Sequence, residues 1–313
     1  MTWVAWRVQR LQFLVAAGVV VALVLWLVAS GLDGHAGWSQ YWNSADVYVL
    51  YALPGLLGLA FGSSLIAFEI DRGTNRVAWT QSITRTRWLG RKLLVGATVS
   101  AGLVAVLIPL LDWWTGAMRS GPAAVSNIVP KLFGITGFVA VGYVLFAFLL
   151  GVTLGTLIRR PGWAFAAGVP IFGGVRLLID GLRPTLVNPA FAVSPAQPFS
   201  GPQPNGWVLN SAYLPIGRTT PAPGQTWASS WDRVGSCFDQ AQSQAGVDRC
   251  AAVAHLHYVV ELQPETHFWM LQGVEAAIYV GLTLILAAVT VIAIRRWRAL
   301  AIDVVGMIVF RSV

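Results

Sequence analysis

Six long apolar segments restrict the fold of this chain more than any other feature of its sequence. A helix that crosses a bilayer needs about 20 mostly apolar residues. The segments that reach or approach this length are Leu11–Ser30, Val47–Phe68, Leu89–Leu111, Leu132–Ile158, Trp163–Ile179 and Phe268–Ile294. Charged residues make up 11% of the chain, against roughly 25% in an average soluble domain. We therefore predict an all-α polytopic membrane protein with six transmembrane helices, rather than a soluble enzyme or a disordered chain.

Two of these segments need separate interpretation. The fifth is short and contains Pro170, Gly173 and Gly174, so a continuous helix and a broken or re-entrant helix both remain open. The first segment is longer than the roughly 7–15 apolar residues of a signal-peptide core. We therefore expect it to remain in the protein as a transmembrane helix.

The basic residues predict the orientation of the chain. With six spans both termini lie on the same side of the membrane, and most of the 21 Lys and Arg residues fall on that side. They are Arg7, Arg10, Arg72, Arg76, Arg85, Arg87, Arg91, Lys92, Arg159, Arg160, Arg295, Arg296, Arg298 and Arg311. The positive-inside rule places this side in the cytoplasm of a cell-membrane protein. The pI of about 10.1 is thereby explained without a nucleic-acid partner.

A soluble extracytoplasmic insertion is predicted between the fifth and sixth spans, over residues 181–266. Residues 188–223 are rich in Pro, Gly, Ser and Asn, which favours irregular loop. Residues 231–260 contain no Pro and carry apolar residues at helical spacing. The predicted organisation is spans one to five in residues 1–180, the loop-rich and helical insertion, span six in residues 267–298 and a cytoplasmic tail in residues 299–313.

Both cysteines of the chain lie in this insertion. Cys237 and Cys250 have 12 residues between them, and outside the cytoplasm thiols can oxidise. A structural disulfide is the favoured interpretation, with two free thiols as the alternative.

Several catalytic motifs are absent from the sequence. It contains no GxxxxGK[ST], no HExxH and no GxSxG. The chain therefore lacks a P-loop for ATP hydrolysis and the motifs of zinc proteases and serine hydrolases. We expect a protein that is not itself an enzyme and that binds no cofactor.

The segment Glu69–Lys92, between spans two and three, is the most informative cytoplasmic connection. Gly73 can end the preceding helix, and Thr74 can serve as the N-cap of a short new one. The apolar residues Val77, Trp79 and Ile83 stand in a polar and basic background, which is typical of an amphipathic helix. Such a helix could transmit movement from a soluble partner to both spans. The alternative is a basic surface loop.

This segment resembles a known family. Glu69, Gly73, Thr74, Arg87 and Lys92 occur in the order found in permease subunits of ATP-binding-cassette (ABC) transporters of the second type. The sequence AWTQSITRTRW, at residues 78–88, is similar to actinobacterial permeases of this type. So is Gln263-Pro264 with the following ETHFWMLQGVEAAIY.

The resemblance implies a permease that forms the cargo pathway of an exporter. It would pair with a second permease, identical or different, in the lipid bilayer, above a dimer of separate ATPase subunits that bind ATP and Mg²⁺. The coupling residues would be Glu69, Gly73, Thr74, Val77, Trp79, Ile83, Arg87 and Lys92. Two alternatives remain open: a polytopic membrane enzyme with an extracytoplasmic site, and a non-transporting sensor or assembly subunit.

Charged residues near the outer side supply the remaining candidates. A metal-binding group could form if the chain is helical around His257 and Glu261, which would then share a face. Its members would be His255, His257, Glu261, Glu265 and His267, but their spacing matches no standard metal site, and we predict no metal.

Glu275 lies inside span six, where a carboxylate should face protein or water. Arg176 and Asp180 are its possible partners. Arg176 and Glu275 are therefore candidates for a cargo pathway or gate, with a structural ion pair as the alternative. Gly58-xxx-Gly62 and Gly151-xxx-Gly155 are interpreted as helix-packing motifs.

Overall fold

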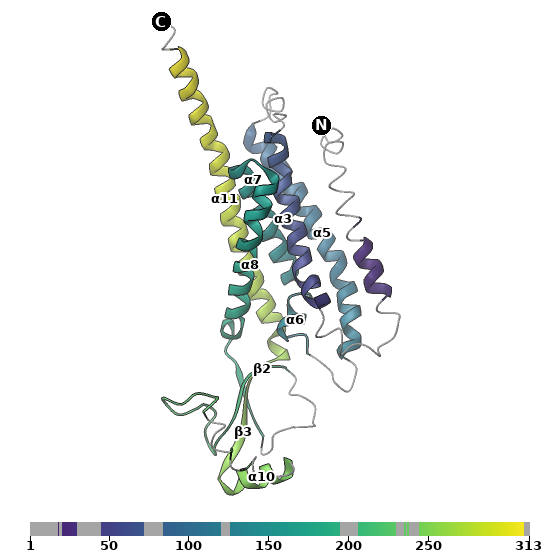
Figure 1. The fold of residues 1–313 in the computed structure, drawn as a ribbon, viewed down its shortest axis with the longest axis vertical. Coiled ribbons are helices and arrows are strands. Elements are labelled where there is room, and N and C mark those ends of the chain that lie inside the picture. The colour runs from purple at the N-terminus through teal and green to yellow at the C-terminus, as the bar shows by residue number, and fades with distance from the viewer. Residues whose placement is uncertain are drawn as a thin grey trace. The chain divides into compact units, whose positions relative to one another are not determined.

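The computed structural model describes two compact units of the chain, shown in Figure 1. The residues described are 18, 21–29, 45–71, 84–119, 126–194, 206–229, 235, 237 and 244–309. We call the first unit the helical unit; it comprises Met1–Thr115, Gly134–Ile179 and Gln272–Val313. We call the second the sheet unit; it comprises Gly116–Phe133 and Asp180–Leu271.

Five helices in the described part of the chain are long and apolar enough to cross a membrane. They are α3 (Ala45–Asp71), α5 (Arg85–Arg119), α7 (Val139–Ile158), α8 (Pro161–Leu186) and α11 (Phe268–Val309). The chain is therefore a mostly helical, multi-pass membrane protein. Residues 21–29 of the predicted first span are helical, but most of that span lies outside the described residues, so the count of six stays a prediction.

Burial distinguishes the central helix of this unit from the outer ones. In α7, 72% of the residues in the apolar stretch are buried, whereas in α5 and in α11 only 22% are buried. The apolar side chains left exposed on α5 and α11 suit contact with lipid, because the core of a bilayer contains hydrocarbon and no water.

The close contact of α3 with α7 depends on glycine. A Cβ atom at Gly58 would lie 2.9 Å from the backbone oxygen of Val144, and one at Gly155 would lie 2.8 Å from the backbone oxygen of Ser63. Gly62 and Gly151 likewise face the backbone of the other helix. The interpretation of both glycine motifs as packing motifs is thus confirmed, since any larger side chain would separate the helices.

The predicted fourth span, Leu132–Ile158, begins too early. The chain forms the short helix α6 (Pro130–Phe133), then a turn, and α7 begins only at Val139. Gly137 in this turn has a φ of 74°, which a continuing helix cannot contain. The side chain of Gln272, from α11, accepts a hydrogen bond from the Val139 N–H (2.8 Å) and donates one to the Thr136 carbonyl (3.0 Å). It thus satisfies a backbone donor at the start of α7.

The fifth span is one continuous helix, so of the two possibilities left open by the sequence the broken one is wrong. Helix α8 runs from Pro161 through Pro170, Gly173 and Gly174 to Leu186. Membrane helices tolerate such residues where neighbouring groups satisfy the freed backbone.

The sheet unit corrects the all-α prediction. It contains a three-stranded antiparallel sheet in the order β1-β3-β2, formed by β1 (Ala190–Ser194), β2 (Gly206–Pro215) and β3 (Leu256–Pro264). Two of these strands lie in the region interpreted as loop, and β3 begins in the region interpreted as helix. Only α10 (Gln244–Val253) is a described helix of regular length there. A 3₁₀ helix, Glu265–His267, links β3 to α11.

One face of this sheet carries a compact core with α10. Alternate residues of β3 point into it, as the two-residue period of a strand requires. The core comprises Tyr213, Cys237, Val247, Ala251, Leu256, Tyr258, Val260 and Leu262.

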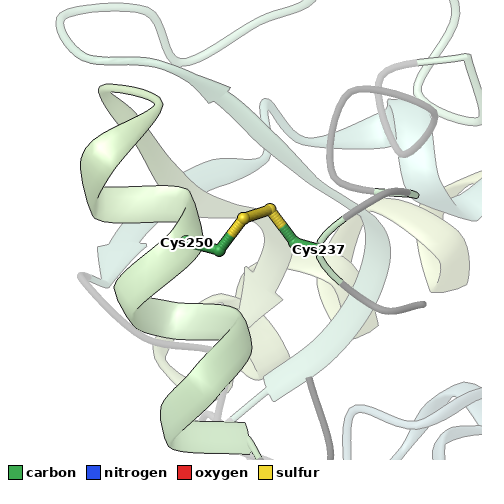
Figure 2. Close-up of a disulfide and its surroundings, with 2 residues drawn as sticks. All are labelled: Cys237 and Cys250. Carbon is green, nitrogen blue, oxygen red and sulfur yellow. A yellow bond between two sulfur atoms is a disulfide. The ribbon is translucent and has the colours of Figure 1, made fainter. Parts of the chain in front are cut away.

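The structure contains the disulfide between Cys237 and Cys250, and Figure 2 shows it joining α10 to the preceding segment. The Cα atoms are 5.7 Å apart, within the usual range for a disulfide. Closing a loop of this length stabilises the folded unit by about 3 kcal/mol in the chain-entropy model.

Candidate functional sites in the helical unit

A buried arginine lies where several membrane helices meet. Arg176, on α8, is 4% exposed, and its Nη1 atom is 3.6 Å from a carboxylate oxygen of Glu275 on α11. Glu275 is fully buried. Arg176 also donates a hydrogen bond of 3.2 Å to the hydroxyl of Tyr279, one turn further along α11. The ion pair thus connects α8 to α11 in a place that water does not reach.

Two tyrosine rings complete the surroundings of this guanidinium. The Cζ atom of Arg176 is 4.1 Å from the ring centre of Tyr51, on α3, and 4.1 Å from that of Tyr143, on α7. Such contacts stabilise a cation that has lost its water. Gly134, in the turn before α7, lies against both Tyr51 and Arg176, and a side chain there would collide with them. We call Arg176, Tyr51, Tyr143, Glu275 and Tyr279 the Arg176 cluster. This cluster joins α3, α7, α8 and α11.

Aromatic side chains extend from this cluster along the helices. Tyr143 and Tyr279 have ring centres 6.2 Å apart, and Phe146 lies 5.9 Å from Tyr279 and 6.4 Å from Phe172. Rings at these separations attract one another. A displacement of α8 or α11 would disturb these contacts together with the ion pair.

The sequence named Arg176 and Asp180 as possible partners of Glu275, and the structure pairs Glu275 with Arg176. Asp180 instead forms an ion pair with Arg183, within the sheet unit. The roles of Tyr51, Tyr143, Tyr279 and Gln272 were not anticipated. Tyrosine is common near the ends of membrane helices, so its type alone carried no signal. A glutamine inside a span does carry one, because such a side chain tends to hydrogen-bond to a neighbouring helix.

A second ion pair joins the end of α3 to the start of α5. Lys92, on α5, contacts the carboxylate of Glu69, on α3, and lies 4.8 Å from the ring centre of Trp88. These helices flank the predicted coupling helix, so the pair holds together the two ends of that connection. Arg87 is exposed on the first turns of α5. Of the other predicted coupling residues, Gly73, Thr74, Val77, Trp79 and Ile83 lie outside the described residues.

A cluster of apolar side chains includes residues of α3 and α5 that are only a few positions from Glu69 and Lys92 in the sequence. It contains side chains from four helices: Leu65, Ile66, Leu89, Phe148, Leu149, Val152 and Ile294. Close-packed side chains transmit displacement because they leave little free volume. The cluster therefore packs α3 and α5 tightly against α7 and α11.

The family comparison covers the Glu69–Lys92 pair and one residue of the Arg176–Glu275 pair. Residues 35–183 match the family described as ABC-2 membrane transporter related. This match supports an ABC-2-type permease, in agreement with the resemblance seen in the sequence. It includes Glu69, Lys92 and Arg176, but not Glu275 or most of the sheet unit. Comparisons with curated proteins and with solved structures each gave no significant match.

The histidine-rich region of the chain does not have the geometry that a metal site requires. His257 and Glu261 lie on strand β3, not on a helix. His257 Nε2 is 3.0 Å from the carbonyl oxygen of Arg218, and Glu261 accepts a hydrogen bond of 2.7 Å from Asn210. His267 is hydrogen-bonded to Gln263. Among the described residues, no three His, Cys, Asp or Glu side chains are grouped to hold a metal ion.

Proposed function

We propose that the chain is the permease subunit of an ATP-driven ABC exporter of the second type. It forms the cargo pathway and couples to separate ATPase subunits. The observation that carries the proposal is the family match over residues 35–183, which includes the Glu69–Lys92 ion pair at the base of the predicted coupling helix. The motifs at residues 78–88 and 263–279 favour the group that contains the actinobacterial permeases.

ATP chemistry in this proposal belongs to the partners. The sequence has no P-loop, so the chain is not an enzyme and holds no cofactor, and ATP and Mg²⁺ bind to a dimer of ATPase subunits. A second permease, identical or different, completes the pathway in the bilayer. Nucleic acid has no part in it.

The orientation follows from the basic residues. Arg72 to Lys92, Arg159, Arg160, Arg295 and Arg296 flank the ends of spans on one side, so this side and both termini lie in the cytoplasm of the cell. The sheet unit, with its disulfide, lies outside the cytoplasm, where thiols oxidise.

Coupling begins at the segment between α3 and α5. Closure of the ATPase dimer displaces the segment, and the Glu69–Lys92 pair makes the ends of α3 and α5 move together. The apolar cluster passes the displacement to α7 and α11. The Arg176 cluster then acts as a gate, because α8 and α11 cannot move apart without separating Arg176 from Glu275. The result is a rocking motion of packed helices between two arrangements.

The alternative functions have less support. A membrane enzyme with an extracytoplasmic site would be built from the His and Glu group together with Glu275. Of these, His257 and Glu261 lie on β3 with hydrogen-bond partners of their own, and Glu275 is paired with Arg176. A sensor or assembly subunit would use the sheet unit, and reconstituted transport would argue against that role.

We expect Trp79→Ala and Gly73→Pro each to abolish ATP-stimulated transport while membrane insertion stays normal. Trp79 is the aromatic anchor of the predicted helix, and such anchors tend to dominate an interface. Proline at residue 73 restricts the backbone where the new helix starts. Co-purification of a P-loop ATPase with the tagged chain, followed by transport in liposomes, measures both effects.

Two controls sharpen this experiment. Trp207→Ala, in the sheet unit, should leave ATPase binding intact. Glu69→Lys should weaken stimulation because it opposes Lys92, whereas Glu69→Lys combined with Lys92→Glu should recover it by restoring the pair. If the Trp79 and Gly73 variants bind and transport like the parent chain, the segment is a passive loop and the proposed coupling is wrong.

The two cysteines provide a test of orientation. An impermeant maleimide applied to intact cells should label the chain only after treatment with an impermeant reductant. The reason is that Cys237 and Cys250 are bonded to each other and, in this proposal, lie on the outer side of the membrane. Labelling without reductant would contradict the disulfide. Labelling that requires lysis of the cells would contradict the orientation.

A further inference from the structure

A cavity of about 530 Å³ lies in the sheet unit, apart from the two ion-paired regions. It is bounded by the end of α8 and the segment after it, by the start of β2, and by the middle of β3. Its lining residues are Pro184, Thr185, Asn188, Pro189, Trp207, Val208, Leu209, Asn210 and Glu261. Nothing in the proposed export mechanism uses this cavity.

Among the described residues, one charged side chain lines the cavity, and it is negative. Glu261, on the central strand, is fixed by a hydrogen bond of 2.7 Å between its Oε2 atom and the side-chain amide of Asn210. Its register partners are Phe191 on β1 and Asn210 on β2. The nearby Arg183 does not line the cavity; it is fully buried, pairs with Asp180 and lies over the ring of Phe133. The cavity therefore favours a positive charge.

The end of helix α8 adds to this preference. Pro184 and Thr185 belong to its last turn, and the helix stops at Leu186. The C-terminal end of a helix carries partial negative charge and attracts cations. Gln263 holds this end in place by donating hydrogen bonds to the carbonyls of Pro184 (3.0 Å) and Val187 (2.6 Å).

The walls suit an organic cation better than a metal ion. Trp207 presents an indole ring, which attracts ammonium groups that have shed their water, and Val208 and Leu209 supply apolar contact. A register irregularity between Val208 and Asn210 interrupts the β2–β3 pairing beside the cavity. Calcium would need about six to eight oxygen ligands, whereas Glu261 is the one carboxylate among the described residues that line the cavity. We propose that this cavity binds a small organic cation of the quaternary ammonium type, held by Glu261 and Trp207.

Calorimetric titration of the purified full-length chain tests this proposal without an ATPase or a transport reaction. Choline is the probe, and its neutral isostere, with a quaternary carbon in place of the nitrogen, is the comparison. We expect saturable binding of choline and none of the isostere. Glu261→Gln should weaken binding by about tenfold or more, because it removes the charge and keeps the shape. Trp207→Leu should weaken it by about twofold to fivefold.

Two further variants keep the result interpretable. Glu265→Gln removes an exposed carboxylate four residues along the chain, outside the cavity, and should bind choline like the parent. Val208→Trp places a large side chain at a position that is already 37% exposed, so it should fold normally and block the cavity. Equal binding of choline and the isostere, unchanged binding by Glu261→Gln and Val208→Trp, or no binding by the parent chain at millimolar choline would each overturn the proposal. None of these outcomes bears on the export function.

Discussion

Glu275→Gln is expected to destabilise the folded chain by about 3–5 kcal/mol, because it leaves the buried charge of Arg176 without a carboxylate. The amide is almost the same size as the carboxylate, so loss of packing contributes little. Thermal unfolding of the chain in lipid nanodiscs measures the effect. Glu265→Gln, which neutralises an exposed carboxylate, is the matched control and should unfold at the parental temperature.

Removing both charges separates a structural pair from a gate. The double variant Arg176→Met with Glu275→Gln removes both charges of this ion pair, and replacing a buried ion pair by neutral groups is often close to neutral in stability. We therefore expect it to recover most of the lost stability. If the pair gates the pathway, transport by the double variant still differs from transport by the parent chain, although its stability has recovered. Normal transport by the double variant would make the pair purely structural, and an unchanged unfolding temperature in Glu275→Gln would contradict both interpretations.

Gly151→Leu is expected to prevent the accumulation of folded chain in the membrane. A Cβ atom at this position would lie 2.6 Å from the backbone nitrogen of Ser63 and still closer to the backbone oxygen of Leu59. Backbone atoms cannot rotate aside as a side chain can, so α3 and α7 must separate. We estimate a cost of about 3 kcal/mol or more, at the upper end for overpacking.

The control for this experiment is Gly102→Leu in α5. Gly102 is exposed on an apolar span, and an added Cβ there would meet nothing within 4 Å. Both variants make the same chemical change in a membrane helix, so hydrophobicity and helix propensity are matched. The amount of folded chain after extraction in mild detergent distinguishes them. Comparable recovery of both would show that α3 and α7 do not require the close contact.

The membrane spans and the disulfide were accessible from the sequence because each follows from a local property. An apolar run of sufficient length must enter the bilayer or be buried, whatever its neighbours are. Cys237 and Cys250 had no other cysteine with which to pair. Arg176 and Glu275 were recognisable since charged residues within spans need protein or water around them. The glycine motifs were recognisable for a similar reason, because their spacing places small residues on one helix face.

The sheet unit was decided by tertiary structure. Residues 244–260 change from the helix α10 to the strand β3 within a few positions, although Val occurs in both. Strand β3 is stable there because β1 and β2, from residues far earlier in the chain, pair with both of its edges. A strand has no hydrogen bonds of its own, so its preference depends on partners that local spacing does not reveal.

The same reason accounts for the surroundings of the functional residues. Apolar segment lengths were enough to predict that the chain crosses the membrane repeatedly. The family resemblance singled out Glu69 and Lys92, and charge within a span singled out Arg176 and Glu275. The packed helices were needed to show that Tyr51 and Tyr143 lie against Arg176, that α7 begins at Val139 beside Gln272, and that α8 continues through Pro170. Each of these outcomes depends on side chains from other helices, and contacts between helices that are distant in sequence form only when the bundle has packed.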